Sequence, residues 1–234
     1  MSKSTHNHKS HIHYLKTLKG MVGMMRDPYH TESVFDIEDG LRDAEAYEFS
    51  LDKIREQPAV CDLLDSRYLA GPTDVDSLSK LPEGTLGKTY ADHIQCNGFD
   101  ADYFRKIEVK SDLDWMLMRI RQTHDIWHVA TGFDVGQYGE LGLKAFELAQ
   151  IQRPMAAVIT TGGVLRYMMK DPEGLAGCLD YIAFGYRLGI EAKPFLGVRW
   201  EDRWAETVDD IRADLNACAK DMPYHVDRIG LDED

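Results

Sequence analysis

Residues 113–151 read LDWMLMRIRQTHDIWHVATGFDVGQYGELGLKAFELAQI, and this stretch decides the fold that we expect. Apolar residues are dense over residues 113–130, which predicts a long helix. Three glycines within residues 132–139 predict a loop, and residues 141–151 predict a second helix that ends before Pro154. The stretch therefore predicts two consecutive helices joined by a short loop.

The rest of the chain repeats this helical pattern. Apolar residues recur mostly at steps of three or four over residues 33–54, 85–97 and 200–215. Asp171 and Pro172 form an N-cap and a first-turn proline, which predict the start of another helix. Residues 195–200 are compatible with a short extended piece. Because the chain has no internal repeat and no low-complexity linker, we expect an all-α fold, with a basic amphipathic segment over residues 1–26 and a single multi-helix domain over residues 27–234.

The chain has 234 residues, of which 44% are hydrophobic, and this is enough for one domain with a substantial core. Its formal net charge of −13 argues against nucleic acid as a partner. The four cysteines are widely spaced, without a CxxC pair, as is typical of a reduced intracellular protein that has no zinc–thiolate site. The sequence shows neither a bilayer-spanning apolar run nor a secretory signal, so we expect an intracellular protein that is cytoplasmic or peripheral to a membrane.

The basic segment over residues 1–26 contains five lysines and arginines and no acidic residue. Its apolar residues, from Ile12 to Met25, follow helical spacing, and two interpretations stay open. The helix packs on the domain core, or it contacts an anionic membrane surface. The four histidines between His6 and His13 could bind metal, but we expect a polar tail because nothing near them would preorganise a site.

Two histidines, His124 and His128, stand one helical turn apart in the helix expected over residues 113–130. At about 100° per residue, Asp125 and Arg121 fall in the same sector of that helix. Histidines at i and i+4 can ligate one divalent ion, and Glu140, which eleven residues separate from His128, could complete the ligand set. Imidazole and carboxylate together suit zinc, and also iron or manganese. The pattern H-D-x-x-H, eleven residues, then E therefore predicts a metal site.

A structural interpretation of the same residues also stays open. Asp125 and Arg121 can form an ordinary helix-surface pair, and Glu140 can be a first-turn acid at the positive end of the next helix. This interpretation has a weakness, because the sector lies within a helix of mostly apolar residues. If Asp125 faces inward, its burial is costly unless a metal or an arginine offsets its charge.

Residues 155–196 are densely apolar, and Arg166, Lys170 and Arg187 interrupt them before Glu191. Helices that are apolar nearly all round are buried, either in a core or along a lipid-shaped cavity. Small residues are frequent here, and they allow close helix packing or leave room for an elongated apolar ligand. The sequence therefore leaves core packing and a lipid cavity as alternatives.

The stretch from Arg119 to Met155 resembles the coenzyme Q (ubiquinone) biosynthesis protein four family. The hallmark of that family is H-D-x-x-H followed by a glutamate after about eleven residues. The matching residues are His124, Asp125, His128 and Glu140. Two flanking stretches, LPEGTLGKTY and GYRLGIEAKPFLGVRWEDRW, match more weakly, so the resemblance covers roughly residues 80–215.

The resemblance implies an all-helical protein, often dimeric and associated with membranes, that acts in isoprenoid quinone synthesis. It implies a divalent metal, with zinc favoured and iron, manganese or magnesium open. The implied metal ligands are His124, Asp125, His128 and Glu140. Asp125 and Glu140 would also have catalytic roles, with Glu140 as a candidate base. Arg121 would be the partner of Asp125 and a candidate substrate-binding residue.

The resemblance also implies a ligand and partners. A prenyl tail would lie along the apolar helices of residues 155–196, where Arg166 and Arg187 would meet an anionic head group. The expected partners are other quinone-biosynthesis enzymes, a membrane surface and a second copy of the chain. In a eukaryotic host, the expected location is the matrix face of the mitochondrial membrane.

Three functions remain as alternatives. The first is a metal-dependent enzyme that replaces the ring carboxylate of a polyprenylated hydroxybenzoate-type intermediate by a hydroxyl, an oxidative decarboxylation. The second is a non-catalytic isoprenoid-lipid-binding scaffold of a quinone biosynthetic complex. The third is a phosphohydrolase, suggested by the His-Asp dipeptide, for which His93 and Asp102 are the upstream ligands that we can nominate.

Overall fold

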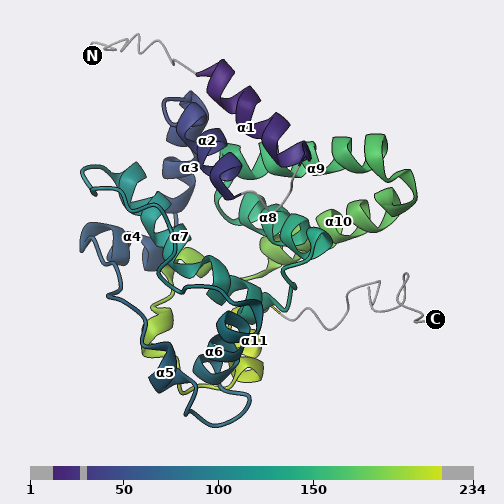
Figure 1. Ribbon diagram of the computed structural model, residues 1–234. Helices are drawn as coiled ribbons and strands as arrows, with labels where there is room; N and C mark the ends of the chain where they lie inside the picture. Colours follow the sequence, from purple (N-terminus) through teal and green to yellow (C-terminus); the bar gives the residue numbers. More distant parts are fainter. Residues whose placement is uncertain (1–12, 27–30, 218–234) are drawn as a thin grey trace, which may run out of the picture.

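The computed structural model describes residues 13–26 and 31–217 of the chain (Figure 1). The α-helices there are α1 (Tyr14–Arg26), α2 (Thr31–Leu41), α3 (Glu45–Arg55), α4 (Pro58–Asp65), α5 (Val75–Leu78), α6 (Leu86–Asn97), α7 (Asp112–Thr131), α8 (Gln137–Ile151), α9 (Pro154–Lys170), α10 (Leu175–Glu191) and α11 (Val208–Leu215). Within the described ranges, the β pairing is limited to an isolated bridge between Thr85 and Thr207. The all-α fold that the sequence predicts is therefore confirmed.

Helix α8 packs against α10 along most of its length, and α9 lies beside both (Figure 1). Glycines permit the close approach of α8 and α10. A Cβ atom on Gly185 would collide with the carbonyl oxygen of Gly142, so no larger residue fits at position 185 without displacing a helix. This tight pairing holds α8, which carries Glu140, in a fixed position in the fold.

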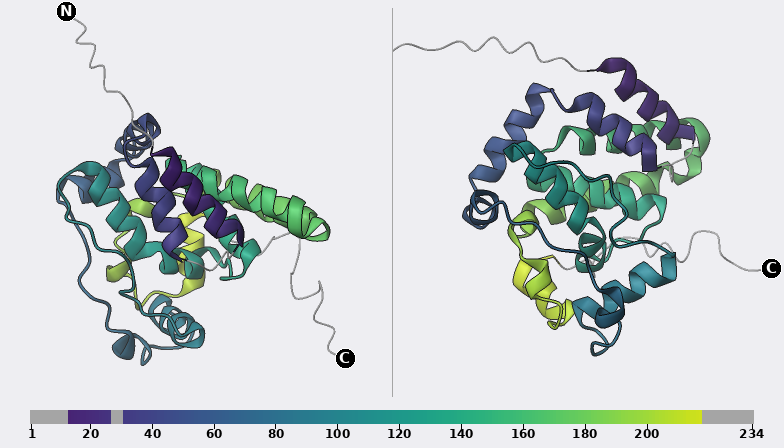
Figure 2. Two further views of the ribbon diagram at one scale, coloured as in Figure 1. Left: turned by 45° about the horizontal axis from the view of Figure 1, so that its top comes forward. Right: turned by 60° about the vertical axis from the view of Figure 1, so that its left-hand side comes forward.

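Helices α1 and α2 run side by side across one end of the molecule (Figure 2). The basic residues of α1 find acidic partners on α2: Lys16 pairs with Asp39 at 2.8 Å, and Lys19 pairs with Asp36 at 2.9 Å. The helix thus packs on the domain, as the first interpretation of the basic segment expects. The predicted polar tail with its histidines before residue 13 lies outside the described residues.

The segment that follows α10 differs from the sequence-based expectation. Residues 195–200 are not extended, since 3₁₀ turns form at Phe195–Gly197 and Trp200–Asp202. The turns bring two aromatic side chains into the core, where the rings of Phe195 and Trp200 are 5.1 Å apart. The predicted N-cap is confirmed, because the Asp171 side chain accepts from the Gly174 N–H at 3.2 Å at the 3₁₀ turn Pro172–Gly174, which leads directly into α10.

Helices α9 and α10 are not buried all round, so this sequence-based expectation is wrong. One side of each packs on the domain, while large apolar side chains on the other side face solvent. The exposed residues are Leu165, Met168, Met169, Leu179, Tyr186 and Ile190. Among the described residues, no helix combines the length and apolar character that crossing a membrane would require.

Candidate metal centre

Helix α7 carries both predicted histidines, and strong signals define its ends. At its start, Ser111 and Asp114 form a reciprocal capping box, and after its end Gly132 adopts a left-handed conformation with φ 83°. The Gly132 N–H donates to the His128 carbonyl oxygen at 2.8 Å, so the helix stops within one turn of His128. His124 and His128 therefore lie one above the other near the end of α7.

The connection from α7 to α8 brings Glu140 opposite these histidines. Gly139 lies against the backbone of Asp134, and a Cβ on Gly139 would collide with the Asp134 carbonyl oxygen. The Asp134 side chain accepts from the Gly136 N–H at 2.7 Å, which stabilises the turn before α8. Glu140 thus stands in the first turn of α8, where the helix dipole also favours an acid.

The atoms of His124, His128 and Glu140 that could ligate a metal all lie within 4.8 Å of one another, and these three residues are called the metal group below. Glu140 Oε1 is 3.2 Å from His128 Nε2, and Glu140 Oε2 is 3.7 Å from His124 Nε2. The side chain of His128 is 1% exposed, whereas those of His124 and Glu140 are 26% and 38% exposed. The group is therefore closed at His128 and accessible to a ligand at His124 and Glu140.

The hydrogen bonding of His128 determines which ring nitrogen faces the group. Its Nδ1 lies 3.0 Å from the Phe133 carbonyl oxygen, which can only accept, so Nδ1 carries a proton. In the neutral ring the lone pair of Nε2 then faces Glu140, and this buried nitrogen has no hydrogen-bond partner among the described residues. A lone pair and a carboxylate at this separation need a cation between them, either a proton or a metal ion. Two imidazoles and a carboxylate fit a divalent ion such as zinc or iron.

The charges of the group act strongly on one another. Burial opposes protonation of His128, but the Glu140 carboxylate outweighs burial and raises the pKa of His128. Burial and the Lys144 ammonium lower the pKa of His124. Burial opposes ionisation of Glu140, yet the two histidines hold the pKa of Glu140 well below its usual range. Glu140 is thus ionised at neutral pH, which is the form that ligates metals.

Asp125, the fourth predicted ligand, is not part of this close group. Its side chain is half-buried, and its carboxylate forms no hydrogen bond or ion pair with the described residues. Burial is the largest cause that raises the pKa of Tyr90 on α6, and the charge of Asp125 is the next largest. The charge of Asp125 therefore acts on α6, while its carboxylate is not one of the close ligand atoms.

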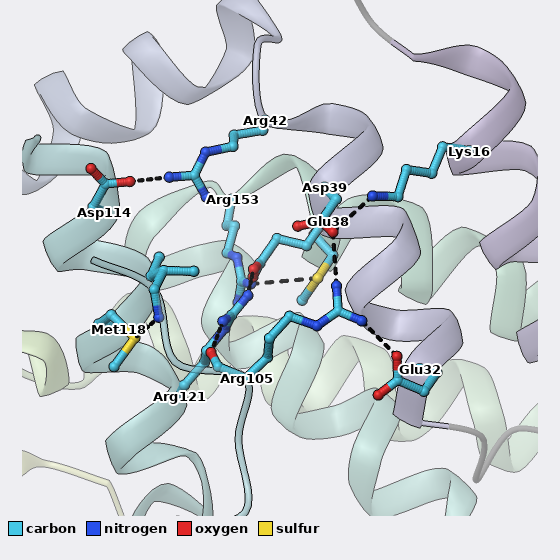
Figure 3. Close-up of polar contacts among 12 residues, drawn as sticks. Lys16, Glu32, Glu38, Asp39, Arg42, Arg105, Asp114, Met118, Arg121 and Arg153 are labelled. Carbon is cyan, nitrogen blue, oxygen red and sulfur yellow. Dashed lines mark hydrogen bonds and ion pairs between the residues drawn. The ribbon is translucent and has the colours of Figure 1, made fainter. Parts of the chain in front are cut away.

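Arg121, the predicted partner of Asp125, belongs to a different buried cluster. Its guanidinium donates to Glu38 of α2 and to the carbonyl oxygen of Arg105. Figure 3 shows the Glu38 carboxylate between the guanidinium groups of Arg121 and Arg153. The predicted pairing of Arg121 with Asp125 is wrong, because a fully buried carboxylate needs a cationic partner more than a half-exposed one does.

The remaining candidate residues do not belong to the close group. Arg166 on α9 is half-buried, and Arg187 on α10 is exposed. His93 on α6 stacks on His128 with ring centroids 5.9 Å apart, and its Nε2 is buried without a hydrogen-bond partner in the described part of the chain. The close group contains neither His93 nor Asp102, so the described residues do not assemble the ligand set that a phosphohydrolase needs.

A series of buried charges that runs from α8 to α2 through Arg153, the residue before α9, was not predicted from the sequence. Lys144 Nζ lies 2.9 Å from Glu147, which in turn lies 2.6 Å from Arg153 Nη1, and Arg153 also donates to Glu38. A signal for it was present, because Lys144 and Glu147 form a charged pair at i and i+3 within the largely apolar run of residues 141–151.

Comparison with known proteins gives a consistent assignment. Residues 42–220 match the family described as coenzyme Q (ubiquinone) biosynthesis protein Coq4. The mitochondrial ubiquinone biosynthesis protein COQ4 of Eremothecium gossypii is 32% identical over 164 residues, and the mitochondrial COQ4 homolog of Danio rerio is 31% identical over 171 residues. These alignments cover 69% and 70% of this chain but 48% and 62% of those proteins, so the chain spans about half the length of the curated relatives it matches.

A solved structure is similar over nearly its whole length. The crystal structure of a protein from Nostoc punctiforme, named for ubiquinone biosynthesis, aligns with a TM-score of 0.78 and 32% identity. The alignment covers 87% of this chain and 98% of that chain. The family match spans most of the described helices and the whole metal group. The chain therefore belongs to the coenzyme Q (ubiquinone) biosynthesis protein Coq4 family.

Proposed function

We propose that this chain binds a divalent metal ion through His124, His128 and Glu140 and acts on a prenylated aromatic acid in quinone biosynthesis. The observation that carries the proposal is the buried Nε2 of His128, which faces a carboxylate oxygen of Glu140 at 3.2 Å. Asp125 follows His124 directly in the sequence and is the proposed further carboxylate of the site. Family membership supports the role in quinone biosynthesis.

The proposed reaction is oxidative decarboxylation. The bond between the ring carbon and the carboxyl group breaks, carbon dioxide leaves, and a hydroxyl forms on the same ring carbon. Dioxygen is the proposed oxidant: one oxygen atom enters the hydroxyl, and the other becomes water with two electrons and two protons from a reductant. A bound divalent ion would supply Lewis-acid stabilisation of the anionic substrate. Glu140, which is half-exposed, is the proposed acceptor of a proton from a ring hydroxyl, and Asp125 is the second candidate for this role.

The exposed apolar side chains of α9 and α10 are the proposed contact for the prenyl tail, since burial of each CH₂ contributes about 0.8 kcal/mol. Arg166 and Arg187 are the proposed partners of an anionic head group. Other quinone-biosynthesis enzymes, a membrane surface and a second copy of the chain are the proposed protein and lipid partners. In a eukaryotic host, the proposed location is the matrix face of the mitochondrial membrane.

A non-catalytic scaffold that binds isoprenoid lipids is the second candidate function. The exposed apolar residues of α9 and α10 favour it, because such surfaces mark sites of contact with lipids or proteins. In this function the metal ion would stabilise the fold or orient a lipid head group without bond breaking.

Metal content, measured by elemental mass spectrometry, tests the proposal first. The chain is purified without chelator or affinity tag, with glutamine in place of the histidines of the N-terminal segment, which could also bind metal. We expect one bound ion per chain and none in His128→Ala. No ion in either protein after addition of divalent metals would remove the basis of the enzymatic function. A bound ion without release of labelled carbon dioxide from a prenylated hydroxybenzoate would favour the scaffold.

The matched control is His93→Phe. This substitution keeps the ring that stacks on His128 and removes both ring nitrogens. We expect His93→Phe to retain the ion, because His93 is outside the close group of ligand atoms. Loss of the ion in this variant would place His93 among the ligands.

A further inference from the structure

A chain of buried charges extends from α8 into the interior. It contains three cations, Lys144, Arg153 and Arg121, and two anions, Glu147 and Glu38. None of these five side chains is more than 9% exposed. Buried ions are stable when partners balance their charges, and this chain of contacts carries one positive charge in excess. The excess would be neutralised by a bound anion.

The hydrogen bonds show where the excess charge is available. Glu147 uses both oxygens, Oε2 for Lys144 at 2.9 Å and Oε1 for Arg153 at 2.6 Å. Glu38 also uses both oxygens, one for Arg121 and one for Arg153 (Figure 3). Lys144 Nζ has three N–H donors and, within the described residues, the single partner Glu147. Lys144 is therefore the cation that can accommodate a further acceptor.

Among these five buried charged residues, Lys144 is the one nearest in sequence to Glu140 of the metal group, on the same helix. It follows Glu140 by one turn of α8, so the two side chains share a face of that helix. With a divalent ion bound, Glu140 is engaged as a ligand and cannot also balance Lys144. An anion bound in this region would meet both the metal ion and the ammonium group of Lys144.

We propose that Lys144 binds the carboxylate of an aromatic acid held at the metal group, and that Glu147, backed by Arg153, positions the ammonium. Lys144 thereby distinguishes an aromatic acid from a neutral aromatic compound of the same shape. The inference rests on the proposed function, because it names the residue that receives the anionic group of the proposed substrate.

The test compares two ligands of equal shape, a 4-hydroxybenzoate that carries one five-carbon prenyl unit and the corresponding neutral benzamide. Dissociation constants are measured by isothermal titration calorimetry on the full chain, with and without metal. We expect the wild-type chain to bind the acid about tenfold more tightly than the amide, since a charge-assisted hydrogen bond contributes on this order. Lys144→Met should weaken binding of the acid about tenfold and change binding of the amide by no more than about twofold.

Glu147→Gln is the matched control, because it disrupts the same contact of 2.9 Å and leaves the Lys144 charge in place. It should retain or increase the affinity for the acid, and both variants should hold as much metal as the wild type. Equal weakening of acid binding in Lys144→Met and Glu147→Gln would show that Lys144 acts only through the fold. Lys144→Gln, which can still donate a hydrogen bond to Glu147, gives the same comparison if Lys144→Met does not fold.

Failure of the proposed function gives a different result from failure of this inference. If no metal binds, but Lys144→Met still weakens binding of the acid and not of the amide, the inference about Lys144 is supported and the proposed metal function is contradicted. If the metal-loaded and metal-free wild-type chains bind the acid and the amide equally, the subsite is overturned whatever the metal content shows.

Discussion

Arg119 illustrates how one buried side chain connects distant parts of the chain. Its side chain is 0% exposed, and it donates to Glu201 at 2.7 and 3.1 Å and to the Val198 carbonyl oxygen at 2.7 Å. These bonds join α7 to the 3₁₀ turns that follow α10. We expect Glu201→Gln to lower the free energy of unfolding by roughly 3 kcal/mol, because it leaves a buried cation without its anion.

Urea denaturation followed by circular dichroism measures this change. The control is Glu56→Gln, which removes an exposed partner 3.6 Å from Lys53 and should change the free energy of unfolding by less than about 0.5 kcal/mol. A similar effect of both substitutions would contradict a structural role for the Arg119 pair.

Glu147 gives a prediction for the dependence of stability on pH. Burial opposes its ionisation, but Arg153 and Lys144 outweigh burial and lower the pKa of Glu147 from 4.5 to about 2. A carboxyl group with a lowered pKa stabilises the folded state above its unfolded pKa, and this stabilisation is lost as the pH falls through the folded pKa. We therefore expect Glu147 to account for roughly 3 kcal/mol of the decrease in the free energy of unfolding between pH 4.5 and 2.

Urea titrations across this pH interval compare the wild type with Glu147→Gln. The variant lacks the titrating group, so its free energy of unfolding should decrease less steeply between pH 4.5 and 2. Parallel curves for the two proteins would show that folding does not lower the pKa of Glu147.

At the scale of elements, the turn between α7 and α8 determines the position of Glu140. We expect Gly139→Ala to weaken metal binding at least about tenfold, because the added Cβ forces the start of α8 away from Asp134 and from the two histidines. Gly71→Ala is the control, since a Cβ on Gly71 would meet no other atom within 4 Å. Competition with a chromogenic chelator measures both affinities, and equal affinities in the two variants would contradict this role of Gly139.

The helices themselves were largely predictable from the sequence, because their signals are local. The helix predicted over residues 113–130 is α7, whose caps are adjacent in the sequence. The next helix begins earlier than predicted, at Gln137, because Gly139 packs inside its first turn rather than in the loop. The three residues that could hold a metal ion were also predictable, since one helical turn and one short loop bring them together.

Contacts between distant helices could not be predicted in this way. Arg121 pairs with Glu38, which lies 83 residues away in the sequence, and no local pattern specifies that choice. The exposed sides of α9 and α10 were missed for a related reason. Their composition indicates apolar helices, but only the arrangement of neighbouring helices determines which side is covered.

At the scale of the whole molecule, α10 presents an apolar stripe to solvent. The exposed residues Ala176, Leu179, Ala183, Tyr186 and Ile190 recur at alternating steps of three and four, the spacing of helices that pair with one another. We expect a second copy of the chain to cover this stripe, which leaves the exposed apolar residues of α9, Leu165, Met168 and Met169, for contact with the prenyl tail. Leu179→Glu combined with Ile190→Glu should convert a dimer into a monomer, as measured by size-exclusion chromatography with light scattering.

The control for this prediction is Leu165→Glu, which introduces the same charge at an exposed apolar position of the neighbouring helix α9. It should leave the dimer intact. A wild-type chain that is monomeric at all concentrations would contradict the prediction, and dissociation by Leu165→Glu as well would extend the interface to α9.

The contact between Glu38 and Arg153 limits when the protein can finish folding during its synthesis. These residues are 115 positions apart. A ribosome that adds roughly 5–20 residues per second needs about 6–23 s to reach Arg153 after Glu38. Throughout that interval the carboxylate lacks one of its two cations and is most stable in water. Helix α2 can therefore reach its final, desolvated position only after most of the polypeptide has been synthesised.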